Sequence, residues 1–294
     1  MFLALGVLLT ACPGIARSQT TSRRPSPAPR MIILPPRVVA REQATLAVVD
    51  SSGRLQPGVA VELSGEQKVI TDSTGRALFI APSASGPLIA KISGSEITAS
   101  TSAIANQDPA KRAESAGDTP GIKISWYPRV LAVTDRFAIT GRGFRSAAGL
   151  NQVFLGDRQC LVVASSPVSL VVLPGPHIPV GATKLRVSAD GRDAVTAPVT
   201  AVLLDFSGPA GAPNAGTVGK LILHVHGATE AVSVEVRNAS PGIIQLLNGN
   251  IQRVGTSGGD ENIAPVELKF LSSGDYTITA RLVPGDSASP PRGN

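Results

Sequence analysis

The most closely spaced histidines in the chain are those of His224-Val225-His226. Residues two apart on a strand point to the same face, so the two imidazoles could share a metal ion. Apolar residues alternate with this pair over 221–225, which places the histidines on the solvent side of the predicted strand. Spacing identifies no third ligand, although Glu235 or a distant aspartate could supply one. We interpret His224 and His226 as exposed strand residues, and we predict neither a metal site nor a cofactor.

Four aspartates, Asp50, Asp72, Asp157 and Asp190, each lie in a short segment that contains glycine. Calcium needs six or more oxygen ligands, and no D-x-D-x-D run is present to provide them. Aspartate and glycine are also the residues that β-turns select for backbone reasons. We therefore interpret these aspartates as turn residues.

No nucleophile elbow, P-loop, zinc-protease helix or dinucleotide fingerprint occurs in the sequence. Trp126-Tyr127 is the one adjacent aromatic pair, and on a strand one ring would face inward and the other outward. Trp126 and Tyr127 are therefore candidate ligand contacts, although 3% aromatic residues make a row of stacking platforms hard to build. We predict no catalytic residues and a protein that is not an enzyme.

The chain has 294 residues and a formal net charge of +6. Its hydrophobic fraction of 43% excludes disorder as a description of the whole chain. Six of its 27 basic residues and none of its 21 acidic residues lie in residues 1–41. The excess charge therefore belongs to a leader and a Pro-rich arm, and the remainder is neutral. A nucleic-acid-binding domain would need a basic folded face, so we predict no nucleic-acid partner.

Residues 1–18 have the features of a signal peptide, with an apolar run from Phe2 to Ala11 that is too short to span a bilayer. Small residues at 16 and 18 favour cleavage before Gln19. An alternative is lipoprotein processing, because Leu9-Thr10-Ala11-Cys12 resembles a bacterial lipobox and would make Cys12 a lipidated first residue. Either route predicts export, to the cell surface, the extracellular space or the periplasm, and membrane contact only through an anchor at Cys12.

Short alternating runs separated by turn residues recur along the chain, and no 10–15-residue stretch has strong helical periodicity. Pro-rich or charged stretches without periodicity predict linkers at 19–30, 105–119 and 205–216 and a tail at 285–294. They leave three units of sandwich size at 31–104, 120–204 and 217–284. Cys160 lies in an apolar strand-like run, which predicts a buried free thiol rather than a nucleophile.

The first unit contains VVDSSGRLQPGVAVEL followed by TDSTGRALFIAP, and it resembles bacterial Ig-like domains of the invasin or carboxypeptidase-regulatory kind. The second contains ITGRGF, the hairpin VFLGDRQC and a closing strand before Pro174-Gly175, and it resembles IPT/TIG domains. Where disulfide-bearing members of that family place a second cysteine, this chain has Val171 or Val172. The third unit resembles no particular family.

The predicted fold class is all-β, with three tandem Ig-like β-sandwiches joined by flexible linkers. The resemblances imply a non-enzymatic modular protein that serves as an adhesion, interaction or spacer module at a bacterial cell envelope. Its partner would be an unknown protein or glycan at the cell surface. An alternative from another class is an accessory carbohydrate-binding protein that works with extracellular polysaccharide-active enzymes.

Overall fold

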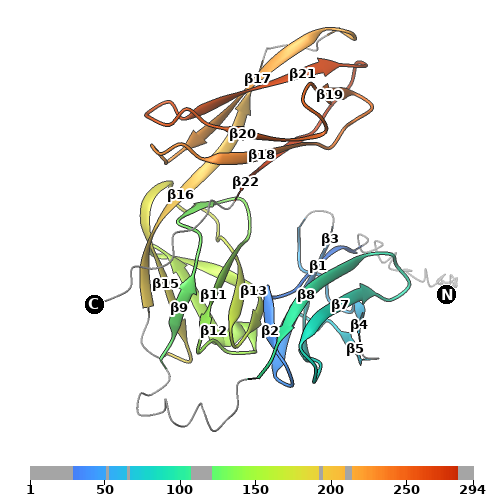
Figure 1. Cartoon of the computed structure of the whole chain (residues 1–294), viewed down its shortest axis with the longest axis vertical. Helices are drawn as coiled ribbons and strands as arrows, with labels where there is room; N and C mark the ends of the chain where they lie inside the picture. The colour runs from blue at the N-terminus through green and yellow to red at the C-terminus, as the bar shows by residue number, and fades with distance from the viewer. Residues whose placement is uncertain are drawn as a thin grey trace, which may run out of the picture.

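The computed structural model describes residues 29–50, 53–64, 67–106, 121–191, 195–208 and 214–283. Within these ranges the structure is all-β, apart from one short 3-10 helix, η1 (Ala148–Leu150). The strands form three β-sandwich domains (Figure 1). Each domain has its own hydrophobic core. The predicted all-β, Ig-like fold class is confirmed. None of the described residues forms a helix that is long and apolar enough to cross a membrane.

The first domain packs a sheet of β1, β3 and β6 against a sheet in the order β2-β8-β7-β4-β5. Its alternating apolar residues point between the sheets, and Leu46, Phe79 and Leu88 are almost fully buried there. The short β2 pairs in parallel with β8, while the other ladders of the domain are antiparallel. The strand bounds are β1 Pro29–Ile33, β2 Arg37–Val39, β3 Gln43–Asp50, β4 Ala60–Leu63, β5 Gln67–Ile70, β6 Arg76–Ile80, β7 Gly86–Ile92 and β8 Thr98–Ile104.

The second domain has one sheet of β9, β11, β14 and the end of β13, and another of β10, β16, β15, β12 and the start of β13. β13 therefore passes from one layer of the sandwich to the other. The core includes Ile139, Leu155 and Leu185. The strand bounds are β9 Lys123–Trp126, β10 Val130–Ala132, β11 Phe137–Arg142, β12 Asn151–Leu155, β13 Arg158–Ser166, β14 Ser169–Leu173, β15 Gly181–Ala189 and β16 Val195–Ser207.

The third domain packs the end of β16 with β17, β21 and β19 against a three-stranded sheet in the order β20-β18-β22. Leu223, Ile244 and Leu268 are fully buried between the two layers. The strand bounds are β17 Val218–His226, β18 Ser233–Asn238, β19 Ile244–Leu246, β20 Ile251–Gly255, β21 Ile263–Phe270 and β22 Ile278–Leu282.

An apolar interface joins the first and second domains. A bulge after Val162 breaks the two-residue alternation of β13. As a result, Cys160 and Val162 face the core of their own domain, whereas Val163 and Ala164 face the first domain. The buried members of this interface are Ile33, Ala47, Val49, Val163, Ala164 and Val171.

Buried hydroxyl groups complete the same junction. The Ser166 and Ser169 Oγ atoms donate to the backbone carbonyl of Arg37 at 2.6 Å and 2.7 Å. Thr45 of β3 and Ser165 of β13 are paired, so the sheets of the two domains are connected by a β-bridge. The first two domains are docked against each other through both apolar and hydrogen-bonded contacts.

A single strand, β16, connects the second and third domains without an intervening loop. Its first part pairs with β15, and Leu203–Ser207 pair with β17 of the third domain. Odd-numbered residues such as Val199 and Ala201 face the second core, while the even-numbered Val202, Leu204 and Phe206 pack in the third. The two cores therefore lie on opposite faces of one strand.

The second junction is closely packed beyond β16. Ala132 of β10 is buried in the core of the third domain. Gly227, which follows β17, lies so close to the second domain that a Cβ atom there would come within 2.8 Å of the Ala201 carbonyl oxygen, the Gly181 nitrogen and Val180 Cβ. Only glycine fits at this position, because its φ of 93° is also strained for other residues.

Two sequence-based boundaries differ from the structure. The first unit is predicted to begin at residue 31, and β1 begins two residues earlier, at Pro29. The assignment of the arm as far as residue 41 on grounds of charge is wrong, because β1 and β2 belong to the first sandwich and Val38 is fully buried. Residues 31–40 are largely apolar, but Arg30, Arg37 and Arg41 and the Pro35-Pro36 pair grouped them with the basic arm. β16 extends to Ser207 and so occupies the first three residues of the predicted linker 205–216.

Candidate functional site

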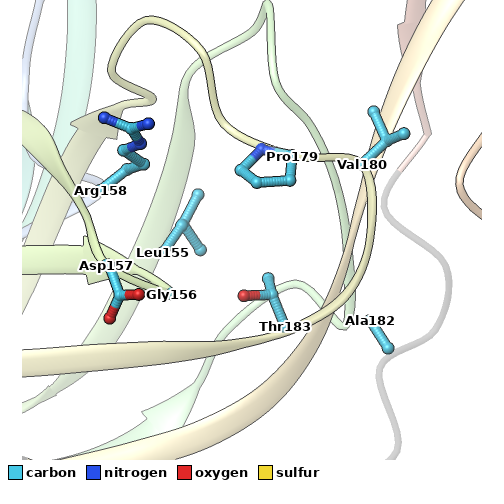
Figure 2. A pocket seen from close by; sticks show the side chains of 8 residues that line it. All are labelled: Leu155, Gly156, Asp157, Arg158, Pro179, Val180, Ala182 and Thr183. Carbon is cyan, nitrogen blue, oxygen red and sulfur yellow. The ribbon is translucent and has the colours of Figure 1, made fainter.

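A surface depression of about 430 Å³ lies on the second domain, where the β12–β13 turn meets the segment that enters β15 (Figure 2). The β12–β13 turn forms one wall, and the segment that enters β15 forms the other. Gly156 allows the tight turn, since its φ is 58°. The lining residues are Leu155, Gly156, Asp157, Arg158, Pro179, Val180, Ala182 and Thr183.

The depression combines an apolar floor with a few polar groups at its rim. Leu155 is 1% exposed and belongs to the core. Figure 2 shows the Thr183 hydroxyl turned toward Gly156 and Asp157, with Arg158 on the same wall as Asp157. The volume suits a small ligand, and this mixture of groups suits binding. The lining holds no histidine, cysteine or pair of carboxylates for acid–base or nucleophilic chemistry.

This depression has no signal in the sequence, because it joins a hairpin turn to a segment more than twenty residues later in the chain. The Gly156-Asp157 turn itself was visible as turn chemistry. The opposite wall has no sequence signal, since Pro179 and Val180 resemble any loop. Val180 also borders Gly227 of the third domain, so the depression lies beside the second junction.

Trp126 and Tyr127 do not line the depression. A bulge between Trp126 and Ile124 shifts the register of β9 against β11. After this bulge Tyr127 packs against the second core, while Trp126 is half-buried and is not among the side chains packed on that core. The prediction that they are ligand contacts stays a prediction, and only Trp126 is placed outside the core.

His224 and His226 lie on the outer face of β17 with their rings stacked at a centroid distance of 6.0 Å. His226 Nε2 lies 3.1 Å from Asp205 Oδ2, and His224 Nε2 lies 2.6 Å from Ser207 Oγ. Glu235 is on the other sheet of the domain and accepts hydrogen bonds from two arginines, so it is not a third ligand. Across the described ranges, no three His, Cys, Asp or Glu residues are grouped to hold a metal ion.

The aspartates interpreted as turn residues lie in or beside turns in the structure. Asp72 Oδ1 accepts hydrogen bonds from the backbone N–H and the hydroxyl of Thr74, both at 2.7 Å. The Thr74 hydroxyl and the backbone N–H groups of Arg76 and Thr74 lower the pKa of Asp72. Asp190 adopts a left-handed φ of 50° and forms an ion pair with Arg145. These contacts are those of turn-stabilising side chains.

Cys160 is a buried free cysteine, 5% exposed, in the second core. Burial raises the pKa of its thiol, which opposes formation of the reactive thiolate. Val172 shares this core, whereas Val171 faces the first domain. Cys12, the predicted lipidation site, lies outside the described residues.

No protein-family model matches the chain, and no curated protein sequence matches it. Solved structures that match the chain include surface layer protein SbsC, domains 1–6 (14% identity, 89% of this chain and 39% of that chain, TM-score 0.22). Another is the Bacteroides ovatus mixed-linkage glucan utilization locus protein SGBP-B in complex with a mixed-linkage heptasaccharide (10% identity, 87% and 76%, TM-score 0.29). A third is the set of Sidekick-1 immunoglobulin domains 1–4 (9% identity, 82% and 73%, TM-score 0.23).

This chain therefore spans well under half of the SbsC fragment that it matches. At these TM-scores the likenesses carry no argument about activity, ligand or partner. The description as Ig-like β-sandwiches rests on the strand pairing and the three cores.

Proposed function

We propose that this chain is a non-enzymatic scaffold of a bacterial cell envelope, in which three Ig-like domains hold fixed positions and present interaction surfaces. The observation that carries the proposal is the continuity of β-structure through both junctions, by the Thr45–Ser165 pair and by β16. Independent modules on flexible linkers would not need buried side chains between them. Ordered domains with fixed spacing suit a spacer or adhesion protein outside the cell.

The finer assignments belong to the same proposal. The first domain resembles bacterial Ig-like domains and the second resembles IPT/TIG domains, with units near 31–104, 120–204 and 217–284. The boundary between the last two falls within β16, near residue 203. Residues 1–18 act as an export signal, followed either by cleavage before Gln19 or by lipidation of Cys12.

Spin-label distances test the scaffold. Labels at Ser100→Cys and Lys269→Cys, both exposed, report on the first and third domains when Cys160→Ala removes the native thiol. The chain from Gln19 onward is expected to give one narrow distance distribution, because both junctions are packed. A broad distribution would contradict the fixed arrangement. In bacteria, the full chain should react with a membrane-impermeant label on intact cells or in the periplasm, and a cytoplasmic location would contradict the proposal.

The depression in the second domain favours a second candidate, an accessory carbohydrate-binding protein. Its volume and its polar groups Asp157, Arg158 and Thr183 suit a sugar unit. Titration with neutral oligosaccharides tests this role. Ala182→Trp fills the depression and should abolish binding, whereas Trp126→Ala should leave it unchanged. Loss of binding in Trp126→Ala but not in Ala182→Trp would instead place the sugar at Trp126.

A further inference from the structure

Three arginines gather on the outer face of the three-stranded sheet of the third domain. Glu235 of the central strand β18 lies directly opposite Arg253 of β20 on one side and Arg281 of β22 on the other. Arg237 lies two residues further along β18, on the same face. Cross-strand neighbours of this kind have Cβ atoms about 5 Å apart, so the four side chains form one cluster. We call it the arginine face.

Glu235 fixes two of these arginines in place. Its Oε1 accepts hydrogen bonds from Arg237 Nε at 2.7 Å and from Arg281 Nε at 3.0 Å. The Glu235 side chain is 10% exposed, whereas those of Arg237 and Arg281 are 47% and 55% exposed. Hydrogen bonds from Arg237 and then Arg281 lower the pKa of Glu235, so it stays ionised at neutral pH. The carboxylate therefore sits beneath the guanidinium groups and holds them toward solvent.

Most guanidinium donors of the cluster have no acceptor among the residues that the structure describes. Each guanidinium has five N–H donors, and Arg237 and Arg281 each use one for Glu235. The Arg253 side chain is exposed and makes no ion pair or hydrogen bond with any residue that the structure describes. The cluster can therefore bind further anionic groups without breaking its own contacts.

The charge of the third domain is unevenly distributed. Residues 217–283 contain five basic and six acidic residues. Three of the basic residues and one of the acidic residues belong to the arginine face. The other five acidic residues are Glu230, Asp260, Glu261, Glu267 and Asp275. A face with a local charge of +2 on a domain that is otherwise acidic is suited to a partner that meets only this face.

We propose that the arginine face binds a carboxylate-bearing polysaccharide chain at the cell surface. This rests on the proposed function, because it names the partner class of the scaffold. The guanidinium fork matches a carboxylate in geometry and charge. Ile251, which is 54% exposed, and Thr279 flank Arg237 in register and offer an apolar surface and a hydroxyl to the sugar ring between two carboxylates.

Two other anionic partners fit this surface less well. A polymer with a phosphate at every unit has no sugar ring to place against the exposed Ile251. A flat bilayer has poor access, because Figure 1 shows the layer of β18, β20 and β22 on the side of the third domain nearer the other two domains. In a carboxylate-bearing polysaccharide, a sugar ring separates successive charges and can lie against Ile251.

Titration of the chain from Gln19 onward with polygalacturonate tests the proposal, with dextran as the neutral probe and polyphosphate as the phosphate probe. Arg253→Gln is expected to weaken polygalacturonate binding about tenfold or more, since a hydrogen bond to a charged group is lost. Lys269→Gln removes the same charge from an exposed position on the opposite sheet and should leave the affinity within about twofold. Binding should weaken strongly with salt, as screening shortens the Debye length from about 30 Å at 0.01 M to about 3 Å at 1 M.

Several outcomes would overturn this inference. They are the absence of polygalacturonate binding, equal losses in the Arg253 and Lys269 variants, or tighter binding of polyphosphate than of polygalacturonate. Unchanged thermal unfolding of both variants shows that each still folds. The spin-label distances and the cellular location do not depend on this titration. If polygalacturonate does not bind, the proposed scaffold role is still untouched. A broad distance distribution would refute the scaffold role without bearing on the arginine face.

Discussion

Val49→Ala tests whether the first domain stabilises the second. Val49 is 7% exposed in the interface between them and lies on the face of its sheet that is turned away from its own core. The change removes two methyl groups at about 0.8 kcal/mol each, or about 1.6 kcal/mol in total. Because the first two domains are docked, we expect them to unfold as one cooperative unit. A unit of their combined size shifts its melting temperature by about 2–4 °C for each kcal/mol, so we expect a decrease of about 3–6 °C.

Fluorescence of Trp126, the single tryptophan of the chain, reports on the second domain, while the mutation lies in the first. Thermal unfolding followed by this fluorescence should therefore show the decrease. Val218→Ala is the matched control, because it removes the same methyl groups from a strand position that is 64% exposed. An unchanged Trp126 transition, together with a lower transition of the first domain by circular dichroism, would refute the docking of the two domains.

Three further predictions follow from single features. Cys160→Ala should lower the free energy of unfolding in urea by about 1–2 kcal/mol and leave the fold intact. Labelling of the native Cys160 thiol should be slow until denaturant is added, because the side chain is buried. Deletion of residues 19–28 should leave thermal unfolding unchanged, whereas deletion of 19–41 should unfold the first domain, because it removes β1 and β2; equal behaviour of the two deletions would contradict the structure. The pKa of Glu235 is lowered below its ordinary value of 4.5, so its contribution to stability is complete above that pH and is lost as the pH falls through the folded-state pKa. Unfolding of Glu235→Gln should accordingly depend less on pH below about 4.5 than that of the native chain, and identical pH profiles would show that the two arginine contacts add no stability.

The strands could be predicted from the sequence because each sandwich places one face in its core. The alternation around Leu223 and Val225 follows this pattern, and both residues are buried as the period of two requires. The same alternation gave the solvent-side position of His224 and His226. Lone Cys160 in an apolar run indicated a buried thiol, and it is buried.

The junctions could not be predicted in this way, because bulges interrupt the alternation on which the prediction depends. The run that contains Val163 and Ala164 is apolar at consecutive positions, which a buried strand of one core would explain equally well. Only the pairing of β13 with β14 reveals that these residues face another domain. The arginine face is also invisible in the sequence, since Arg237, Arg253 and Arg281 are brought together by strand register alone.

The strand shared by the second and third domains limits how these domains can be exchanged during evolution. Because odd-numbered residues of β16 serve one core and even-numbered residues serve the other, inserting or deleting one residue within it would turn one set outward. A gene fragment that ended after the second domain would leave Ala132 and Val202 uncovered. The second and third domains are therefore expected to be inherited as a pair.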